Sequence, residues 1–307
     1  MISENRNLSR RRFLKAGIGS TIALAGDGSG LFAKQSDAMN STDAKAIVRI
    51  TPGKNRESDR QTIYFEYPAL PDQVFRLVIP ELVSDTESDP MPWGLASPGT
   101  WVVKENHAAF TDTVKDTIRA DVDVVFQGER VEARVKVTNL TNRLWKNSNA
   151  FSCFFLKQAP LFSDPALDRT FVPIGGRWEK LSDVVRADSI PQGALTAYEP
   201  AGGPDLDSLW LLSQIKNRYS GKLDHGSVCV VSSDGRWIAG MTAPQPAYVF
   251  NNPGLPCIHA DPLLGDVAPG KTGEGRSILH VFKGTIDDFS ERCRLDRETY
   301  DKMEVTR

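Results

Sequence analysis

The chain has 307 residues, 40% of them hydrophobic and 25% charged. These fractions are typical of a globular protein, and they exclude a disordered or collagen-like chain. Lys and Arg number 37 against 39 Asp and Glu, and the resulting net charge of −2 argues against a basic nucleic-acid-binding protein.

The N-terminus is typical of an export signal. Residues 9–15 read SRRRFLK, and an apolar, glycine-containing stretch follows at residues 16–26. That stretch is too short to span a bilayer, which takes about 20 residues. A basic segment before a short apolar one indicates a signal peptide. The order S-R-R-x-F-L-K resembles the twin-arginine (Tat) signal, so we expect residues 1–33 to be a Tat signal peptide.

The Tat resemblance implies a bacterial protein that the Tat machinery exports, already folded, to the periplasm or the exterior. Many Tat passengers carry a cofactor, which makes a divalent metal a candidate, whereas others use this route only because they fold fast. Five basic and two acidic residues fall within 1–33, so removing the leader leaves a mature charge of −5. Residues 34–44 are small and polar and are expected to form a linker. No later run approaches 18 apolar residues, so we expect the mature chain not to span a membrane.

Short segments of β type recur after the linker. Three strands are expected early, at residues 47–50, 62–67 and 74–79. The clearest hairpin runs from Asp121 to Asn139, where apolar and mostly charged residues alternate along the second strand. A second hairpin is expected at 228–241 around Asp234-Gly235, a strong two-residue turn signal.

Antiparallel hairpins with one polar face predict a mainly β fold, an antiparallel β-sandwich of the jelly-roll or supersandwich type, rather than a parallel α/β sheet. One or two short helices are expected, at residues 205–219 and at the C-terminus, where the segment from Thr285 to Asp288 resembles a capping box at the start of a helix. The segments 151–204 and 262–275 read as loops because they are rich in proline or glycine. We expect residues 45–307 to form one domain, because a single sandwich can reach roughly 250 residues.

The four cysteines all follow the leader. An oxidising destination permits disulfides, and four cysteines allow three full pairings. The absence of a C-x-x-C pair argues against a zinc ribbon. Buried free thiols are at least as well supported, because cysteine packs as a small hydrophobic side chain. The cysteines are Cys153, Cys229, Cys257 and Cys293.

The first candidate site lies in the segment CIHAD. Extended backbone places Cys257, His259 and Asp261 on one face, because side chains alternate along a strand. The next predicted strand carries His280, and pairing of the two strands would bring it to His259 and Asp261. Two imidazoles and a carboxylate suit a divalent metal or general acid–base catalysis. The alternatives are a core histidine for His280 and a turn residue before proline for Asp261.

Aromatic residues in predicted loops suggest a carbohydrate ligand, because flat rings stack on the apolar faces of sugars. Trp178 and Trp93 are the candidates, with Arg169 and Glu199 as polar contacts. Two carboxylates about 5–10 Å apart would suit glycosidic-bond chemistry. His107 is a further candidate base. The alternatives are tryptophans that fill the ends of a sandwich core and loop charges that are merely solvated.

Late in the chain, Pro269-Gly270-Lys271 precedes the predicted strand 276–282. With the mature length and the many antiparallel strands, this turn resembles galactose-mutarotase-type β-sandwich domains, in which a Pro-Gly-Glu-like turn precedes a closing strand. The resemblance implies a sandwich of that type. The family's catalytic His/Glu pair is not assignable here: no segment matches its histidine motifs, and Lys271 stands in place of the acidic residue of the turn. Mutarotase activity is therefore not implied.

Three functions remain open from the sequence. The leading hypothesis is an exported carbohydrate-recognising protein, with hydrolase, lyase or epimerase activity as an extension. The alternative is a metal-dependent enzyme or metal-binding protein that uses His259 and Asp261, together with His280. The third is a structural or interaction sandwich without a small-molecule site. No G-x-S-x-G, Walker or H-E-x-x-H motif is present to name a reaction.

Overall fold

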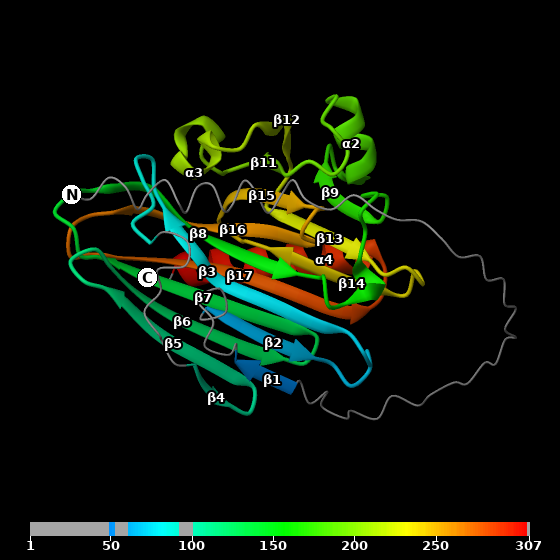
Figure 1. The fold of residues 1–307 in the computed structure, drawn as a ribbon, viewed down its shortest axis with the longest axis horizontal. Helices are drawn as coiled ribbons and strands as arrows, with labels where there is room; N and C mark the ends of the chain where they lie inside the picture. The colour runs from blue at the N-terminus through cyan, green and yellow to red at the C-terminus, as the bar shows by residue number, and fades with distance from the viewer. Residues whose placement is uncertain (1–48, 53–60, 92–100, 306–307) are drawn as a thin grey trace, which may run out of the picture.

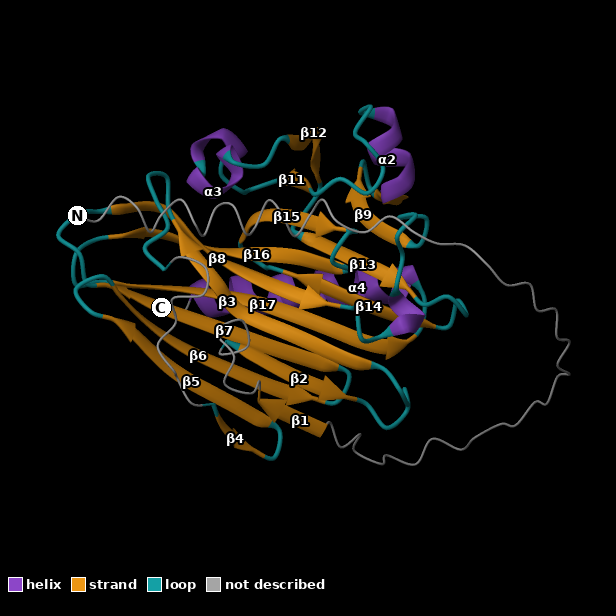
Figure 2. Ribbon diagram, viewed as in Figure 1, coloured by secondary structure: helices purple, strands orange, loops and turns teal. Residues whose placement is uncertain are grey.

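The structure is a computed structural model that describes residues 49–52, 61–91 and 101–305. In these ranges the chain folds into two packed, mostly antiparallel sheets with few helices, as Figure 1 and Figure 2 show. The predicted mainly β sandwich is therefore confirmed. The expected signal peptide (1–33), the expected linker (34–44) and Trp93 lie outside the described residues.

One sheet has eight strands and the other has nine within the described residues. The order of the eight-stranded sheet is β1 (Arg49–Pro52), β2 (Thr62–Glu66), β3 (Val74–Ser84), β8 (Trp145–Phe155), β16 (Cys257–Val267), β15 (Pro246–Asn252), β11 (Thr196–Pro200) and β12 (Asn217–Leu223). The order of the nine-stranded sheet is β10 (Arg177–Lys180), β9 (Thr170–Ile174), β13 (Ser227–Val231), β14 (Trp237–Thr242), β17 (Thr272–Lys283), β7 (Arg130–Asn139), β6 (Ile118–Gln127), β5 (His107–Val114) and β4 (Val102–Lys104). The helices are η1 (Pro160–Phe162), α2 (Leu181–Ala187), η2 (Leu206–Ser208), α3 (Trp210–Ser213) and α4 (Ile286–Val305).

Both predicted hairpins are present. The β6–β7 hairpin turns at Gly128, whose φ of 62° is a conformation that glycine adopts without steric cost. The β13–β14 hairpin turns in the same way at Gly235, with a φ of 71°. On β7, four apolar residues at alternate positions are fully buried, while the residues between them are not. This strand alternation, read correctly from the sequence, fixes which face of the nine-stranded sheet meets the other sheet.

Aromatic rings from both sheets fill the core between them. The ring of Phe65 lies 5.5 Å from that of Phe75, 6.1 Å from that of Phe154 and 5.5 Å from that of Phe126. Phe126 belongs to the nine-stranded sheet, so these contacts join the two layers. All four are at most 2% exposed, and burying each such side chain contributes about 1.5–3 kcal/mol.

The prediction that residues 262–275 form a loop is wrong. β16 continues through Pro262 to Val267, and β17 begins at Thr272. Two of the glycines that suggested a loop, Gly273 and Gly275, serve close packing between the sheets instead: a Cβ at Gly275 would lie 2.7 Å from Leu264 and 2.8 Å from Pro262. Glycine at this position therefore lets β17 approach β16 across the core.

The expected helix at 205–219 is also wrong. The segment forms only the short η2 and α3, and β12 begins at Asn217. Leucines of this segment, such as Leu209 and Leu212, pack over Tyr248 and Phe250 on the outer face of the eight-stranded sheet. The leucines that suggested a helix are buried as predicted, but most of the backbone that carries them is irregular. Burial against the sheet therefore outweighs helix propensity in this segment. The expected loop at 151–204 likewise contains the end of β8 and β9, β10, α2 and β11.

The C-terminal helix α4 is present and lies on the outer face of the nine-stranded sheet, behind β14 and β17 in Figure 1. Its N-terminus has the expected reciprocal cap: the Asp288 carboxylate accepts from the Thr285 backbone N–H at 2.8 Å, and the Thr285 hydroxyl accepts from the Asp288 N–H at 3.3 Å. Phe289 packs where Gly240 leaves room on β14. In the described part of the chain, no helix is both long and apolar enough to span a bilayer.

Candidate functional site

His259 and Asp261 lie side by side on the outer face of the eight-stranded sheet, as the strand alternation predicted. Both are buried, with 1% and 0% exposure. His259 Nδ1 lies 3.6 Å from Asp261 Oδ2, and Asp261 Oδ1 accepts a 2.6 Å hydrogen bond from the Ser152 N–H. The imidazole packs against the rings of Phe151 and Phe250. Burial raises the pKa of Asp261 well above its usual value, and the Ser152 N–H only partly opposes this.

The expected convergence of His280 with this pair is wrong. β16 and β17 belong to opposite sheets, and their inward side chains, such as Ala260 and Leu279, meet in the core. The two histidines therefore point to opposite outer surfaces. His280 bonds through Nε2 to Asp296 of α4 at 2.7 Å. Burial lowers the pKa of His280, although the hydrogen bond and charge of Asp296 oppose this shift.

His107 and Glu199 lie in two further ion pairs. His107 Nε2 is 2.5 Å from Asp123 Oδ1, and both side chains are exposed. Glu199 pairs with Lys222 across β11 and β12. In the described residues, no further catalytic group is found beside either residue. The structure therefore adds nothing to the predicted roles of His107 as a base and Glu199 as a ligand contact.

Trp178 and Arg169 have structural contacts. Trp178 lies on β10, not in a loop, and its ring packs against Phe289 at 5.3 Å and His225 at 5.7 Å. The Arg169 guanidinium donates to backbone carbonyls of three separate loop or strand positions. Both side chains therefore make contacts within the fold, and both remain partly exposed.

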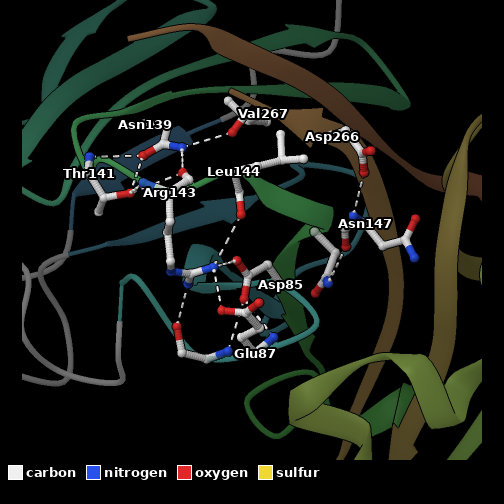
Figure 3. Close-up of polar contacts among 11 residues, drawn as sticks. Asp85, Glu87, Asn139, Thr141, Arg143, Leu144, Asn147, Asp266 and Val267 are labelled. Atoms are coloured by element: carbon white, nitrogen blue, oxygen red, sulfur yellow. Dashed lines mark hydrogen bonds and ion pairs between the residues drawn. The ribbon is translucent and has the colours of Figure 1, made fainter. Parts of the chain in front are cut away.

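A polar network closes one end of the sandwich (Figure 3). The buried Asp85 accepts from Arg143 Nη1 at 2.5 Å and from the backbone N–H groups of Glu87 and Ser88 at 2.9 Å each. The Asn139 amide donates to two carbonyls of neighbouring loops. Each of these buried groups has a partner, so the network holds the loops together as a scaffold.

A cavity of about 320 Å³ lies beside α4, on the outer face of the nine-stranded sheet. Sequence reasoning missed it, because its walls come from strands and a helix that are distant along the chain. Its polar lining comprises Gln127, Arg130, Glu132, Arg276, Asp296, Thr299 and Tyr300. Its apolar lining comprises Pro244, Ile278 and Leu295.

The charged groups of this cavity are held in place by one another. Arg130 donates to Asp296 Oδ1 and to Glu132 Oε2, at 3.0 Å each. Arg276 donates to Glu132 Oε1 at 3.2 Å, and its guanidinium lies 5.7 Å from the centre of the Tyr300 ring. Burial raises the pKa of Asp296, but the bonds from His280 and Arg130 outweigh it, so the net shift is downward. The charged side chains of the cavity therefore hold one another in fixed positions.

A thiol–imidazole cluster adjoins the His259–Asp261 pair. The ligand atoms of Cys153, Cys257 and His259 all lie within 4.8 Å of one another, and Cys257 Sγ is 3.4 Å from His259 Nε2. All four cysteines of the chain are free and buried. Although burial raises the pKa of Cys257, the hydrogen bond from Cys153 and the nearby His259 bring it below its usual value. Burial raises the pKa of Glu81, which hydrogen-bonds to Cys153, to about 8. The sequence offered no signal that Cys153 or Glu81 joins this cluster, because only strand pairing brings β8 beside β16 and β3 beside β8.

No protein-family model and no curated protein matches the chain. Solved structures share its outline at very low identity. The Slr1438 protein of Synechocystis sp. PCC 6803 is 9% identical over 79% of this chain and 94% of its own, with a TM-score of 0.47. A galactose mutarotase related enzyme of Lactobacillus acidophilus is 9% identical over 74% and 96%, with a TM-score of 0.42. The GH36 alpha-galactosidase AgaB of Geobacillus stearothermophilus is 9% identical over 78% and 27%, with a TM-score of 0.37.

Proposed function

We propose that the protein is exported by the Tat route to the periplasm or the exterior, where it recognises a neutral carbohydrate in the cavity beside α4. The lining of that cavity is the observation that carries the ligand proposal. The export proposal rests on the N-terminal sequence SRRRFLK.

The lining suits a neutral polyhydroxy ligand better than an ion. Arg130 and Arg276 are balanced by Glu132 and Asp296, so a charged ligand would meet both signs. A sugar hydroxyl both donates and accepts, and one hydroxyl can therefore bridge a guanidinium and a carboxylate. The fork of a guanidinium and the two oxygens of a carboxylate also match neighbouring hydroxyls in pairs. These features favour a sugar over an anion or a cation.

The size and the apolar wall of the cavity support a small sugar. Its 320 Å³ lies at the lower end of the range for ligand pockets, about 300–1,000 Å³. The Tyr300 ring and the Leu295 side chain offer an apolar surface to the C–H face of a pyranose. A monosaccharide, or one residue of a longer glycan, is the ligand that we expect.

Titration calorimetry with the full-length protein tests this proposal. The panel holds neutral monosaccharides and disaccharides, with a uronic acid and an amino sugar as charged counterparts. Thr299 lines the cavity from the exposed side of α4, so Thr299→Trp should fill it and weaken binding at least tenfold. Asp301→Trp places the same bulk on an exposed position of the helix outside that lining, and it should bind like the wild type. No binding across the panel, or equal binding by both variants, would contradict the proposal.

Turnover is a separate step of the same proposal. Glu132 and Asp296 are the carboxylates of the cavity, and hydrolase, lyase or epimerase activity would use one of them as acid or base. Product analysis on the same panel separates a carbohydrate-active enzyme from a binding protein. A sandwich with neither binding nor turnover would instead have the structural or interaction role.

A further inference from the structure

We propose that Cys153, Cys257 and His259 bind a thiophilic divalent metal ion of the zinc class, at a site on the outer face of the eight-stranded sheet. This site is separate from the cavity beside α4, and it replaces the combination of His259, Asp261 and His280 that the sequence suggested. Asp261 is the residue that positions His259, not a direct ligand.

The ligand set and its spacing fit a tetrahedral metal. Two thiolates and one imidazole are ligands that zinc prefers, and three protein ligands leave one position for water or substrate. Zinc–sulfur and zinc–nitrogen bonds of about 2.3 and 2.0 Å place tetrahedral S and N ligands about 3.5 Å apart. The Cys257 Sγ–His259 Nε2 distance is 3.4 Å, and the Cys153 thiol lies within 4.8 Å of both atoms. The three side chains therefore need little rearrangement to bind an ion.

Two buried atoms lack hydrogen bonds in a way that a bound metal would explain. Within the described residues, His259 Nδ1 and Asp261 Oδ2 have no hydrogen-bond partner, although they face each other at 3.6 Å. A metal on Nε2 places the imidazole proton on Nδ1, from which it points to the carboxylate. Metal-bound histidines almost always donate their other ring N–H in this way, often to a carboxylate. A closer approach of the two side chains from 3.6 Å to hydrogen-bond distance would then satisfy both orphaned atoms at once.

A further oxygen donor adjoins the cluster. Glu81 lies beside Cys153 on the same outer face of the eight-stranded sheet, and its side chain is partly exposed. We assign the fourth ligand position to the Glu81 carboxylate.

Cobalt titration of the reduced, chelator-treated full chain provides the first test. One equivalent of Co(II) should produce a thiolate-to-cobalt charge-transfer band and the visible bands of a tetrahedral ion, and Zn(II) should displace it. Cys257→Ser and His259→Gln should remove or shift these bands. Cys293→Ser is the matched control: Cys293 is equally buried but lies on α4, where it packs against the other sheet, so the bands of this variant should equal those of the wild type.

A positioning role of Asp261 has its own readout. Asp261→Asn should leave the cobalt spectrum tetrahedral with two sulfur ligands, but it should weaken metal affinity by about 10–100-fold. An unchanged affinity would remove Asp261 from the proposal, and loss of the thiolate band would show that it acts on the ligands themselves.

X-ray absorption of the zinc-loaded wild type decides the ligand set without relying on any variant. Two sulfur neighbours and at least one imidazole nitrogen are expected. Coordination by oxygen and nitrogen alone would overturn the proposal. It would also be overturned if the native protein took up no metal, or if mass spectrometry found Cys153 and Cys257 joined as a disulfide.

Discussion

Two histidine–aspartate pairs occupy opposite outer faces of this sandwich, and their surroundings differ. His280 and Asp296 are joined by a 2.7 Å hydrogen bond, and Asp296 also accepts from Arg130. His259 and Asp261 face each other at 3.6 Å without a hydrogen bond. A buried polar group costs free energy unless it is paired. The carboxylate of the first pair is thus already hydrogen-bonded, although His280 Nδ1 has no partner among the described residues, whereas both facing atoms of the second pair, His259 Nδ1 and Asp261 Oδ2, lack a hydrogen bond.

The largest loss of stability should come from breaking the hydrogen-bonded His280–Asp296 pair. Asp296→Asn leaves Arg130 and His280 without their shared charged partner, and removing one member of a buried ion pair costs about 3–5 kcal/mol. We expect a loss of about 3 kcal/mol, because Arg130 is 24% exposed and regains some water. Urea denaturation measures the free energy of unfolding. A loss no larger than that of Asp261→Asn would abolish the contrast between the two pairs.

Adding metal should stabilise the second region and leave the first unaffected. Zinc at 100 times its dissociation constant should raise the free energy of unfolding by about 2.7 kcal/mol, because it binds only the folded state. Chemical denaturation with and without zinc provides the measurement. The increase should disappear in Cys257→Ser and persist in Cys293→Ser. A gain that survives in Cys257→Ser would place the metal elsewhere.

The two aspartates should respond to pH with opposite signs. The folded-state pKa of Asp296 is lowered, so its stabilisation is present at neutral pH and is lost as the pH falls through that pKa. The folded-state pKa of Asp261 is raised, so in the metal-free protein its contribution falls as the pH rises above about 3.9, the pKa of an unperturbed aspartate. Asp261→Asn should therefore stabilise the metal-free protein increasingly toward neutral pH. Urea denaturation at a series of pH values measures this. The prediction would be refuted if Asp261→Asn and Asp296→Asn changed the pH dependence of the free energy of unfolding in the same direction.

The smallest effect should come from a third pair, which is exposed. His107 and Asp123 are 38% and 54% exposed, and exposed ion pairs contribute only about 0–1 kcal/mol. His107→Gln should therefore change the free energy of unfolding by about 0.5 kcal/mol or less. A larger loss would mean that hydrogen-bond distance, rather than burial, decides what such a pair contributes.

The fold was predictable to the extent that local patterns determine it. The alternation on β7 and the turns at Gly128 and Gly235 predicted two hairpins that are present. The prediction of a helix at 205–219 failed because its leucines are buried against the sheet and not by helical packing. The parts of β16 and β17 around Pro262 and Gly275 were missed because these residues serve close contact between the sheets. No local sequence pattern indicates such a contact.

The candidate site was predictable only within one strand. Period-2 alternation placed Cys257, His259 and Asp261 on one face, and their side chains meet there. Cys153 comes from a neighbouring strand, and its place beside Cys257 depends on the register between β8 and β16. His280 was misplaced because the sequence cannot say that consecutive strands enter different sheets.

By itself, the sequence determined the secondary-structure class, the hairpins, the capped C-terminal helix and the resemblance of its first residues to an export signal. These follow from interactions between residues that are near in the chain, which leave a periodic or motif-like trace. Tertiary structure alone decided the two-sheet order, the opposite orientation of His259 and His280, the thiol cluster and the cavity beside α4. Each of these depends on contacts between distant segments, and the free energy of burial selects such contacts without leaving a local pattern.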